Sequence, residues 1–118
     1  MTWEIELHPV FREEVKDLPL KVRRSLGETL VAVEIEGPDL GRPNVDTLHG
    51  SKHSNMKELR FSADGGVWRF AFAFDPEQRA VILVGGDKQG VNQKKFYSWL
   101  LSVADERFDA YAQKEKNR

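Results

Sequence analysis

The segment from Val67 to Phe74 constrains the fold most strongly, because aromatic residues occupy every second position from residue 68 onward. Side chains alternate between the two faces of a β-strand, so this spacing places all of these rings on one face. The other face carries Arg69 together with the small residues Ala71 and Ala73. The pattern predicts a strand whose aromatic face is covered by helices and whose opposite face is a shallow concavity holding one guanidinium group.

Turn sequences separate this strand from a predicted strand on each side. Met56–Ser62 precedes it across Ala63-Asp64-Gly65-Gly66, which is typical of a hairpin, and Ala80–Val84 follows a proline-containing turn. The run Ala80–Val84 is entirely apolar, which suits a strand buried on both faces, and Gly85-Gly86 is expected to end it. Residues 56–84 therefore predict a three-stranded antiparallel meander.

One more strand and three helices are predicted outside the meander. Residues 2–7 alternate as in a half-buried strand, and two helical patterns follow, which begin near Pro9 and Pro19 and end at Gly37-Pro38. A long helical pattern begins near Asn92 and is expected to fray into a polar tail over residues 114–118. The irregular stretch 38–55 favours neither a functional loop nor a plain connection over the other.

Helices and strands occur in separate runs, without the β–α–β alternation of a parallel sheet. Such an order indicates an α+β fold. We therefore expect residues 1–118 to form a single domain, with a small, mostly antiparallel sheet, an N-terminal helical hairpin and a C-terminal helix.

Composition and charge exclude several classes of function. The formal net charge is −1, while residues 46–100 carry eight Lys/Arg against six Asp/Glu, so any affinity for nucleic acid must come from a local surface. The chain has no cysteine, which excludes disulfides and thiolate metal sites. No apolar run approaches the roughly 20 residues of a membrane helix, and the acidic N-terminus is unlike a signal peptide. We expect a cytoplasmic protein that does not bind membranes.

Arg60 and Arg69 are the strongest candidates for a binding site. If the apolar faces of their two strands coincide, both arginines emerge on the same side of the sheet, with Glu58 able to orient one of them. The planar guanidinium group matches phosphate oxygens in a bidentate manner. A single arginine more often forms a surface ion pair, but two that converge on an alanine-lined face favour a phosphodiester site. Lys88, just past the last strand, could bring a third cation.

Other candidates carry weaker signals. His49 and His53 lie in a Gly/Ser-rich loop without a metal-site motif, which argues against zinc and leaves proton transfer open. Tyr97 could bind a phosphate or stack on a base, although its place on an apolar helical stripe favours core packing. Lys94 belongs to a lysine pair that is typical of a solvated surface. The segment Gly85–Gly90 lacks the pattern of a nucleotide-binding P-loop.

Three short motifs resemble those of RelE/HigB-type toxins of type II toxin–antitoxin systems, in particular the phage-derived branch of the RelE/ParE superfamily. The motifs are Leu48-His49-Gly50-Ser51-Lys52, Lys57-Glu58-Leu59-Arg60-Phe61 and Trp68-Arg69-Phe70. The resemblance covers nearly the whole chain in order and spacing. It implies a RelE-like fold and a small cytoplasmic toxin that cleaves mRNA at the ribosome as a metal-independent endoribonuclease, without a cofactor. It also implies inhibition by a cognate helix-turn-helix antitoxin in a hetero-oligomer.

The resemblance also implies roles for individual residues. Arg60 and Arg69 would contact the substrate phosphate, Lys57 and Lys88 would join the same basic cluster, and Tyr97 or a loop histidine would transfer a proton. The basic candidates for substrate binding nearby are His49, Lys52, His53 and Lys94. The segment that follows the last strand often contains paired lysines in this family, whereas this chain has Asp87 before a single lysine.

Two alternatives to a ribonuclease remain open from the sequence. One is a ParE-like toxin that inhibits DNA gyrase without cleaving RNA. The other is a catalytically inactive module that retains only antitoxin binding.

Overall fold

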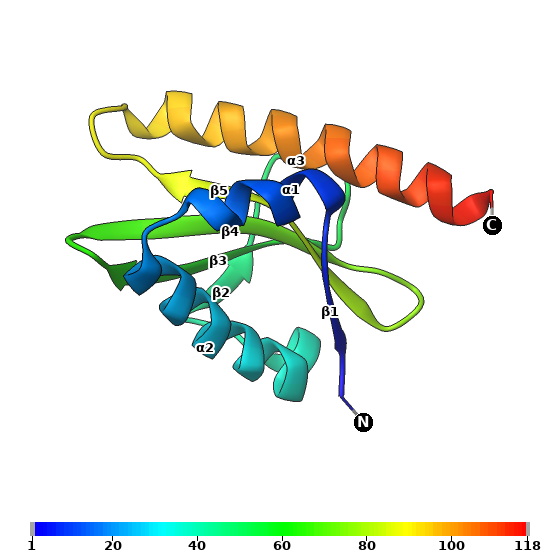
Figure 1. Cartoon of the computed structure of the whole chain (residues 1–118). Coiled ribbons are helices and arrows are strands. Elements are labelled where there is room, and N and C mark those ends of the chain that lie inside the picture. The colour runs from blue at the N-terminus through cyan, green and yellow to red at the C-terminus, as the bar shows by residue number, and fades with distance from the viewer. Residues whose placement is uncertain (1, 118) are drawn as a thin grey trace.

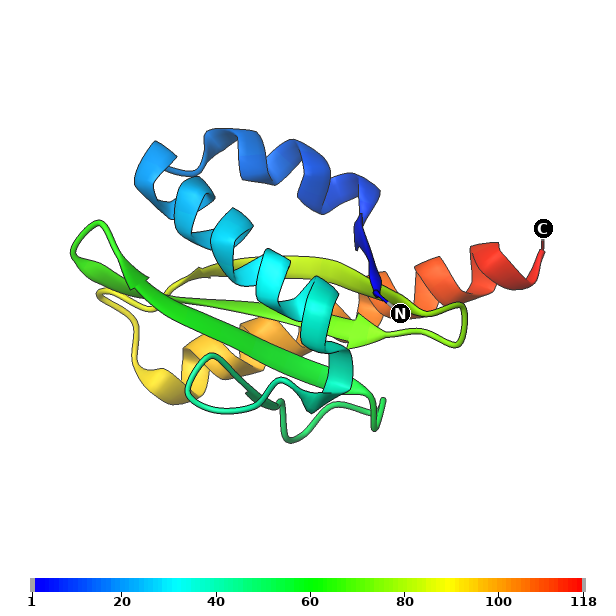
Figure 2. The same ribbon diagram turned by 90° about the horizontal axis from the view of Figure 1, so that it is seen from below.

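A computed structural model describes residues 2–117, which form a five-stranded sheet with helices on both faces (Figures 1 and 2). The strand order is β1-β5-β4-β3-β2, and the only parallel pair in this described part is β1 with β5. The strands are β1 (Glu4–Leu7), β2 (Val45–Thr47), β3 (Met56–Ala63), β4 (Gly66–Phe74) and β5 (Arg79–Asp87). The predicted α+β class with a mostly antiparallel sheet is confirmed.

The helices begin where local sequence signals place them. They are α1 (Pro9–Glu14), α2 (Leu20–Glu36) and α3 (Gln93–Lys116), with 3₁₀ turns at Val15–Asp17 and Gly37–Asp39. Pro9 lies in the first turn of α1, where a missing N–H costs nothing. At the start of α3, the side chain of Asn92 accepts a hydrogen bond of 2.8 Å from the backbone N–H of Lys95. No helix within residues 2–117 has the length and apolar character needed to cross a membrane.

Two apolar cores lie on opposite faces of the sheet. Under α1 and α2, the aromatic side chains of β4 pack with residues from both helices, among them Phe11, Val22, Leu26 and Val33. On the other face, α3 packs against Ala71, Ala73, Val81, Leu83 and Val84 through Phe96, Leu100, Ala104 and Phe108. The prediction of a covered aromatic face is confirmed. The prediction of an open alanine face is wrong, because α3 lies on these alanines and leaves them 0% exposed.

The structure differs from the predicted elements at three further places. Residues 45–47 form the edge strand β2, which is too short to show a period in the sequence. Strand β5 continues through Gly85-Gly86 to Asp87, because β4 pairs with it along this length. Helix α3 remains helical to Lys116, so the predicted frayed tail is wrong over residues 114–116, and residue 118 lies outside the described residues.

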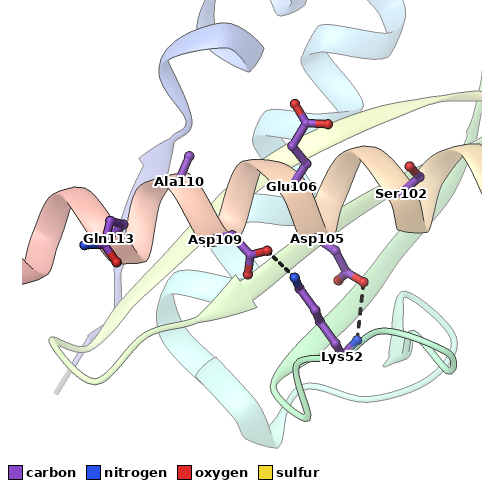
Figure 3. Close-up of a pocket in the computed structure, with 7 residues that line it drawn as sticks. All are labelled: Lys52, Ser102, Asp105, Glu106, Asp109, Ala110 and Gln113. Carbon is purple, nitrogen blue, oxygen red and sulfur yellow. Dashed lines mark hydrogen bonds and ion pairs between the residues drawn. The ribbon is translucent and has the colours of Figure 1, made fainter.

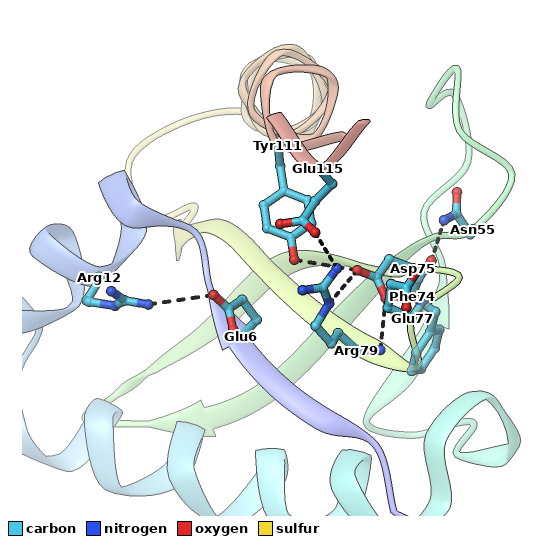
Figure 4. A network of polar contacts seen from close by, with 9 residues as sticks. All are labelled: Glu6, Arg12, Asn55, Phe74, Asp75, Glu77, Arg79, Tyr111 and Glu115. Atoms are coloured by element: carbon cyan, nitrogen blue, oxygen red, sulfur yellow. Dashed lines mark hydrogen bonds and ion pairs between the residues drawn. The ribbon is translucent and has the colours of Figure 1, made fainter. Parts of the chain in front are cut away.

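A buried network of polar contacts fixes the end of α3 to the turn between β4 and β5 (Figure 4). Arg79 Nε donates to Asp75 Oδ2 at 2.8 Å, and its Nη2 donates to Glu115 Oε2 at 2.9 Å. The guanidinium group also lies 5.6 Å from the centre of the Tyr111 ring. These contacts explain why the helix stays ordered in a polar part of the sequence.

Stability should fall when His8 becomes protonated. Its Nδ1 accepts a hydrogen bond of 3.1 Å from Val10 N–H and thereby caps α1. Burial, and then the positive charge of Arg107, lower the pKa of His8 below its usual 6.5. The folded state thus binds this proton less well than the unfolded chain, so the stabilisation is present above pH 6.5 and is lost as pH falls through the lowered pKa.

Urea unfolding at pH values between 7.5 and 5 measures this effect. We expect His8→Asn, which keeps a capping acceptor without titrating in this range, to flatten the pH dependence of the unfolding free energy. The same change at the exposed His49 should leave the dependence as in the wild type. Equal pH dependence in wild type and His8→Asn would contradict the assignment.

Candidate active site

Arg60 and Arg69 face each other across β3 and β4 as direct partners, on the side of the sheet that α3 covers. The carboxylate of Glu58 lies between them, with Oε1 3.8 Å from Arg60 Nη1 and Oε2 3.9 Å from Arg69 Nε. Glu58 is only 6% exposed, and the side chain of Arg69 is 13% exposed. The structure therefore brings both predicted arginines together around one buried carboxylate.

Tyr97 joins this group from the first turns of α3. Its hydroxyl group donates a hydrogen bond to Glu58 Oε2, and its ring centre lies 5.9 Å from the guanidinium carbon of Arg69. Burial, and then the hydrogen bond and charge of Glu58, raise the pKa of Tyr97 above its usual 10. The phenol is therefore protonated at neutral pH and serves as a hydrogen-bond donor.

Arg69 is the unusual member of the group. Its Nε and Nη1 atoms are buried and have no hydrogen-bond partner in the described part of the chain. The carboxylate of Glu58 attracts it at 3.9 Å, beyond hydrogen-bonding distance. Buried N–H groups without an acceptor cost free energy and are rare in native proteins. An anion could satisfy them only after neighbouring side chains move, because neither atom is open to solvent.

Lys88 lies on the same side as these unpaired donors. Together with Arg69, Val67 and the glycines of the β3–β4 turn, it lines a hollow of about 210 Å³ at the end of the sheet. Asp87 and Gln89 also line this hollow. The position combines a buried arginine with a lysine that is partly exposed to solvent, an arrangement that can hold a phosphate group.

Lys57 lies on the opposite face of the sheet from Arg60, Arg69 and Glu58. It neighbours Glu58 in β3, so its side chain points to the opposite face of the sheet. There its Nζ donates to Thr47 Oγ1 at 3.3 Å, beside the core under α2. Side chains alternate between the two faces of a strand, so Lys57 and Arg60 lie on opposite faces of the sheet. The prediction that these two residues share one basic cluster is wrong.

The loop residues Lys52 and His53 also lie elsewhere. Lys52 Nζ pairs with Asp109 of α3 (Figure 3). His53 Nε2 lies 2.8 Å from the same carboxylate. Asp109 is twelve residues beyond Tyr97, or about 18 Å along the helix. These contacts raise the pKa of Lys52 and lower that of Asp109. The loop is thus anchored to an acidic stretch of α3, away from the arginines.

His49 and Lys94 are exposed. His49 precedes Gly50, where an added Cβ would lie 3.1 Å from Leu101, one turn beyond Tyr97 on α3. Lys94 lies in the first turn of α3. Roles for these two residues in substrate binding stay predictions.

The described residues include no cluster of three or more His, Cys, Asp or Glu side chains that could hold a metal ion. The residue that the sequence undervalued is Glu58, which was expected only to orient an arginine. The signal that could have identified it is its position two residues before Arg60, which places an acid on the same face of the strand as that arginine.

The chain shares its fold with a solved RelE toxin. It superposes on a mutant of the Escherichia coli toxin RelE in the free state with a TM-score of 0.65 and 18% identity, over 91% of this chain and 98% of that chain. Residues 13–109 match the family described as "Phage derived protein Gp49-like (DUF891)".

Two proteins of Mycobacterium tuberculosis named as toxins are similar in sequence. HigB3 is 46% identical over 83 residues, which cover 70% of each chain. HigB2 is 47% identical over 77 residues, which cover 64% of this chain and 38% of HigB2. The chain belongs to the Gp49-like family of RelE/HigB-type toxins, and it is the toxin of a toxin–antitoxin system.

Proposed function

We propose that this toxin is an endoribonuclease that cleaves mRNA at the ribosome without a metal ion. The observation that carries the proposal is the pair of buried, unpaired N–H donors of Arg69, which lie beside Arg60, Tyr97 and Lys88. Fixed donors of this kind stabilise charge that develops on a phosphate during its attack. The RelE/HigB family supports the same class of activity.

In the proposed reaction, the ribose 2′-hydroxyl attacks the adjacent phosphorus atom. Arg60 and Arg69 bind the phosphate oxygens, and Lys88 adds positive charge at the edge of the site. These groups stabilise the extra negative charge as the O2′–P bond forms. The phenol of Tyr97 remains protonated at neutral pH and can donate a hydrogen bond to a group of the substrate.

Induced expression followed by mapping of mRNA 5′ ends tests this function. We expect growth arrest with new 5′ ends in mRNA for the wild type, and neither for Arg60→Ala. Arg24→Ala, at an exposed position of α2 on the other face of the sheet, should behave as the wild type. Cleavage by the purified toxin should persist in the presence of EDTA.

The same experiment separates the alternatives. Growth arrest without new mRNA ends would exclude the ribonuclease, and a gyrase supercoiling assay would then test the ParE-like activity. Absence of arrest at normal protein level would indicate an inactive module. We further propose that the antitoxin is a helix-turn-helix protein, which co-purification with the product of a neighbouring reading frame would test.

A further inference from the structure

Glu58 is a carboxylate in a place where packing alone would favour an apolar side chain. On the same face of the sheet, its neighbour along β3 is the buried Met56 and its partner on β4 is the buried Ala71. Burying a carboxylate costs several kcal/mol unless charges and hydrogen bonds compensate for it. Here the compensation comes entirely from proposed site residues, since the carboxylate is in contact with Arg60, Arg69 and Tyr97.

The hydrogen bond between Tyr97 and Glu58 joins a group that can donate a proton to a group that can accept one. The phenol donates and the carboxylate accepts, and the raised pKa of Tyr97 keeps its proton in place at neutral pH. Attack by a ribose hydroxyl requires one group that accepts a proton and one that supplies a proton to the leaving oxygen. Glu58 and Tyr97 are a hydrogen-bonded pair with these two properties.

Asp87 lines the hollow beside Arg69 and Lys88, but its orientation does not suit this reaction. It pairs with Trp68 across β4 and β5, so its side chain points toward the face that carries the aromatic rings. A Cβ added at Gly66 would lie 3.2 Å from Asp87 Oδ2, in keeping with this orientation. Glu58 is therefore the carboxylate on the side of Arg60 and Arg69.

We propose that Glu58 is the proton acceptor, and Tyr97 the proton donor, of the RNA cleavage proposed above, on which this assignment rests. The 2′-hydroxyl proton passes to Glu58 as the O2′–P bond forms. The P–O5′ bond breaks with its electron pair on O5′, which takes the proton of Tyr97. Glu58 then returns a proton to Tyr97 across their hydrogen bond. The products are a 2′,3′-cyclic phosphate and a 5′-hydroxyl group, and no further reactant is needed.

Glu58→Gln tests this assignment because the amide oxygen can still accept the hydrogen bond from Tyr97 but cannot take up a proton. Single-turnover cleavage of ribosome-bound mRNA, with a free RNA oligonucleotide in parallel, should slow by about 100- to 10,000-fold. Affinity for an RNA with a 2′-O-methyl group at the cleaved position should be unchanged or tighter, because a negative charge near the phosphate is lost. Glu58→Asp keeps a carboxylate at this position and should therefore retain part of the activity. Its cleavage rate should still fall at low pH, as expected when a carboxylate accepts the proton.

Glu28→Gln, the same chemical change at an exposed position of α2, is the matched control and should cleave at the wild-type rate. Thermal unfolding of each variant establishes that it is folded at the assay temperature. Wild-type cleavage rates in Glu58→Gln, or a parallel loss of RNA affinity and rate, would overturn the assignment while leaving the ribonuclease in place. Absence of cleavage by the wild type would instead remove the ribonuclease proposal, and this assignment with it.

Discussion

Arg69→Ala should lower the proposed RNA cleavage by about 100- to 1,000-fold, the usual cost of removing a fixed donor from a site where charge develops. The same change should cost only part of the stability of a buried ion pair, because Glu58 loses the charge of Arg69 at 3.9 Å but no hydrogen bond. Arg69 makes no hydrogen bond through Nε or Nη1, and Glu58 keeps its contacts with Tyr97 and Arg60. A loss of activity much larger than the loss of stability is expected where a side chain is held unsatisfied for a ligand.

Arg79→Ala is the matched control, because the side chains of the two arginines are almost equally buried, at 14% and 13% exposure. Arg79 differs in that Asp75 and Glu115 satisfy it. Its removal takes the guanidinium partner from Asp75 and Glu115, while Asp75 keeps the backbone N–H groups of Glu77 and Arg79. The loss of these charged hydrogen bonds should cost about 1.5–3 kcal/mol of stability. Activity measured on the folded fraction should be retained.

Single-turnover cleavage and urea unfolding of both variants distinguish the two roles. Arg69→Lys should recover only part of the activity, because an ammonium group restores the charge without the two-pronged geometry. A large loss of stability in Arg69→Ala would show that this arginine holds the fold together rather than binding a ligand.

Much of the site could be predicted from the sequence because its register is set by side-chain alternation. The aromatic residues of β4 must face one core, so Arg69 must face the other side, and the hairpin turn then places Arg60 opposite it. The same rule applied to Lys57 would have placed that lysine on the far face. The family resemblance alone places Lys57 in the basic cluster, and the strand period overrides it.

The remaining features depend on contacts between distant segments, which periodicity does not describe. The small residues Ala71 and Ala73 suggested an open surface, yet their size is what allows α3 to lie close to the sheet. The loop at residues 51–53 is bound to carboxylates of α3 more than fifty positions away. Likewise, Tyr97 meets Glu58 only because α3 returns across β4 and β5.

Gly85→Ala should destabilise the fold more than any other single methyl addition at a glycine of β5. A Cβ at this position would lie 1.9 Å from Cδ2 of Phe70, a distance that real side-chain contacts do not reach. Phe70 cannot move away freely, because it is fully buried and packs against the rings of Phe11 and Phe61 at 5.9 and 5.6 Å. Overpacking in such a core costs about 1–3 kcal/mol or more, against a total stability of about 5–15 kcal/mol.

Gly86→Ala provides the adjacent control, with an expected effect of opposite sign. A Cβ at Gly86 would meet the ring of Trp99 at 3.7 Å, an ordinary van der Waals distance. An alanine that fits the native backbone restricts the unfolded chain and can stabilise by about 0.4–1 kcal/mol. Urea unfolding, followed by circular dichroism, should therefore show a lower midpoint for Gly85→Ala and an unchanged or higher midpoint for Gly86→Ala.

Adding Phe70→Leu to Gly85→Ala should recover part of the lost stability, because the added methyl group clashes with the ring of Phe70. Equal midpoints for the two single variants would show that β5 can shift away from Phe70, and that the close approach of these strands does not fix the end of the sheet that carries Arg69.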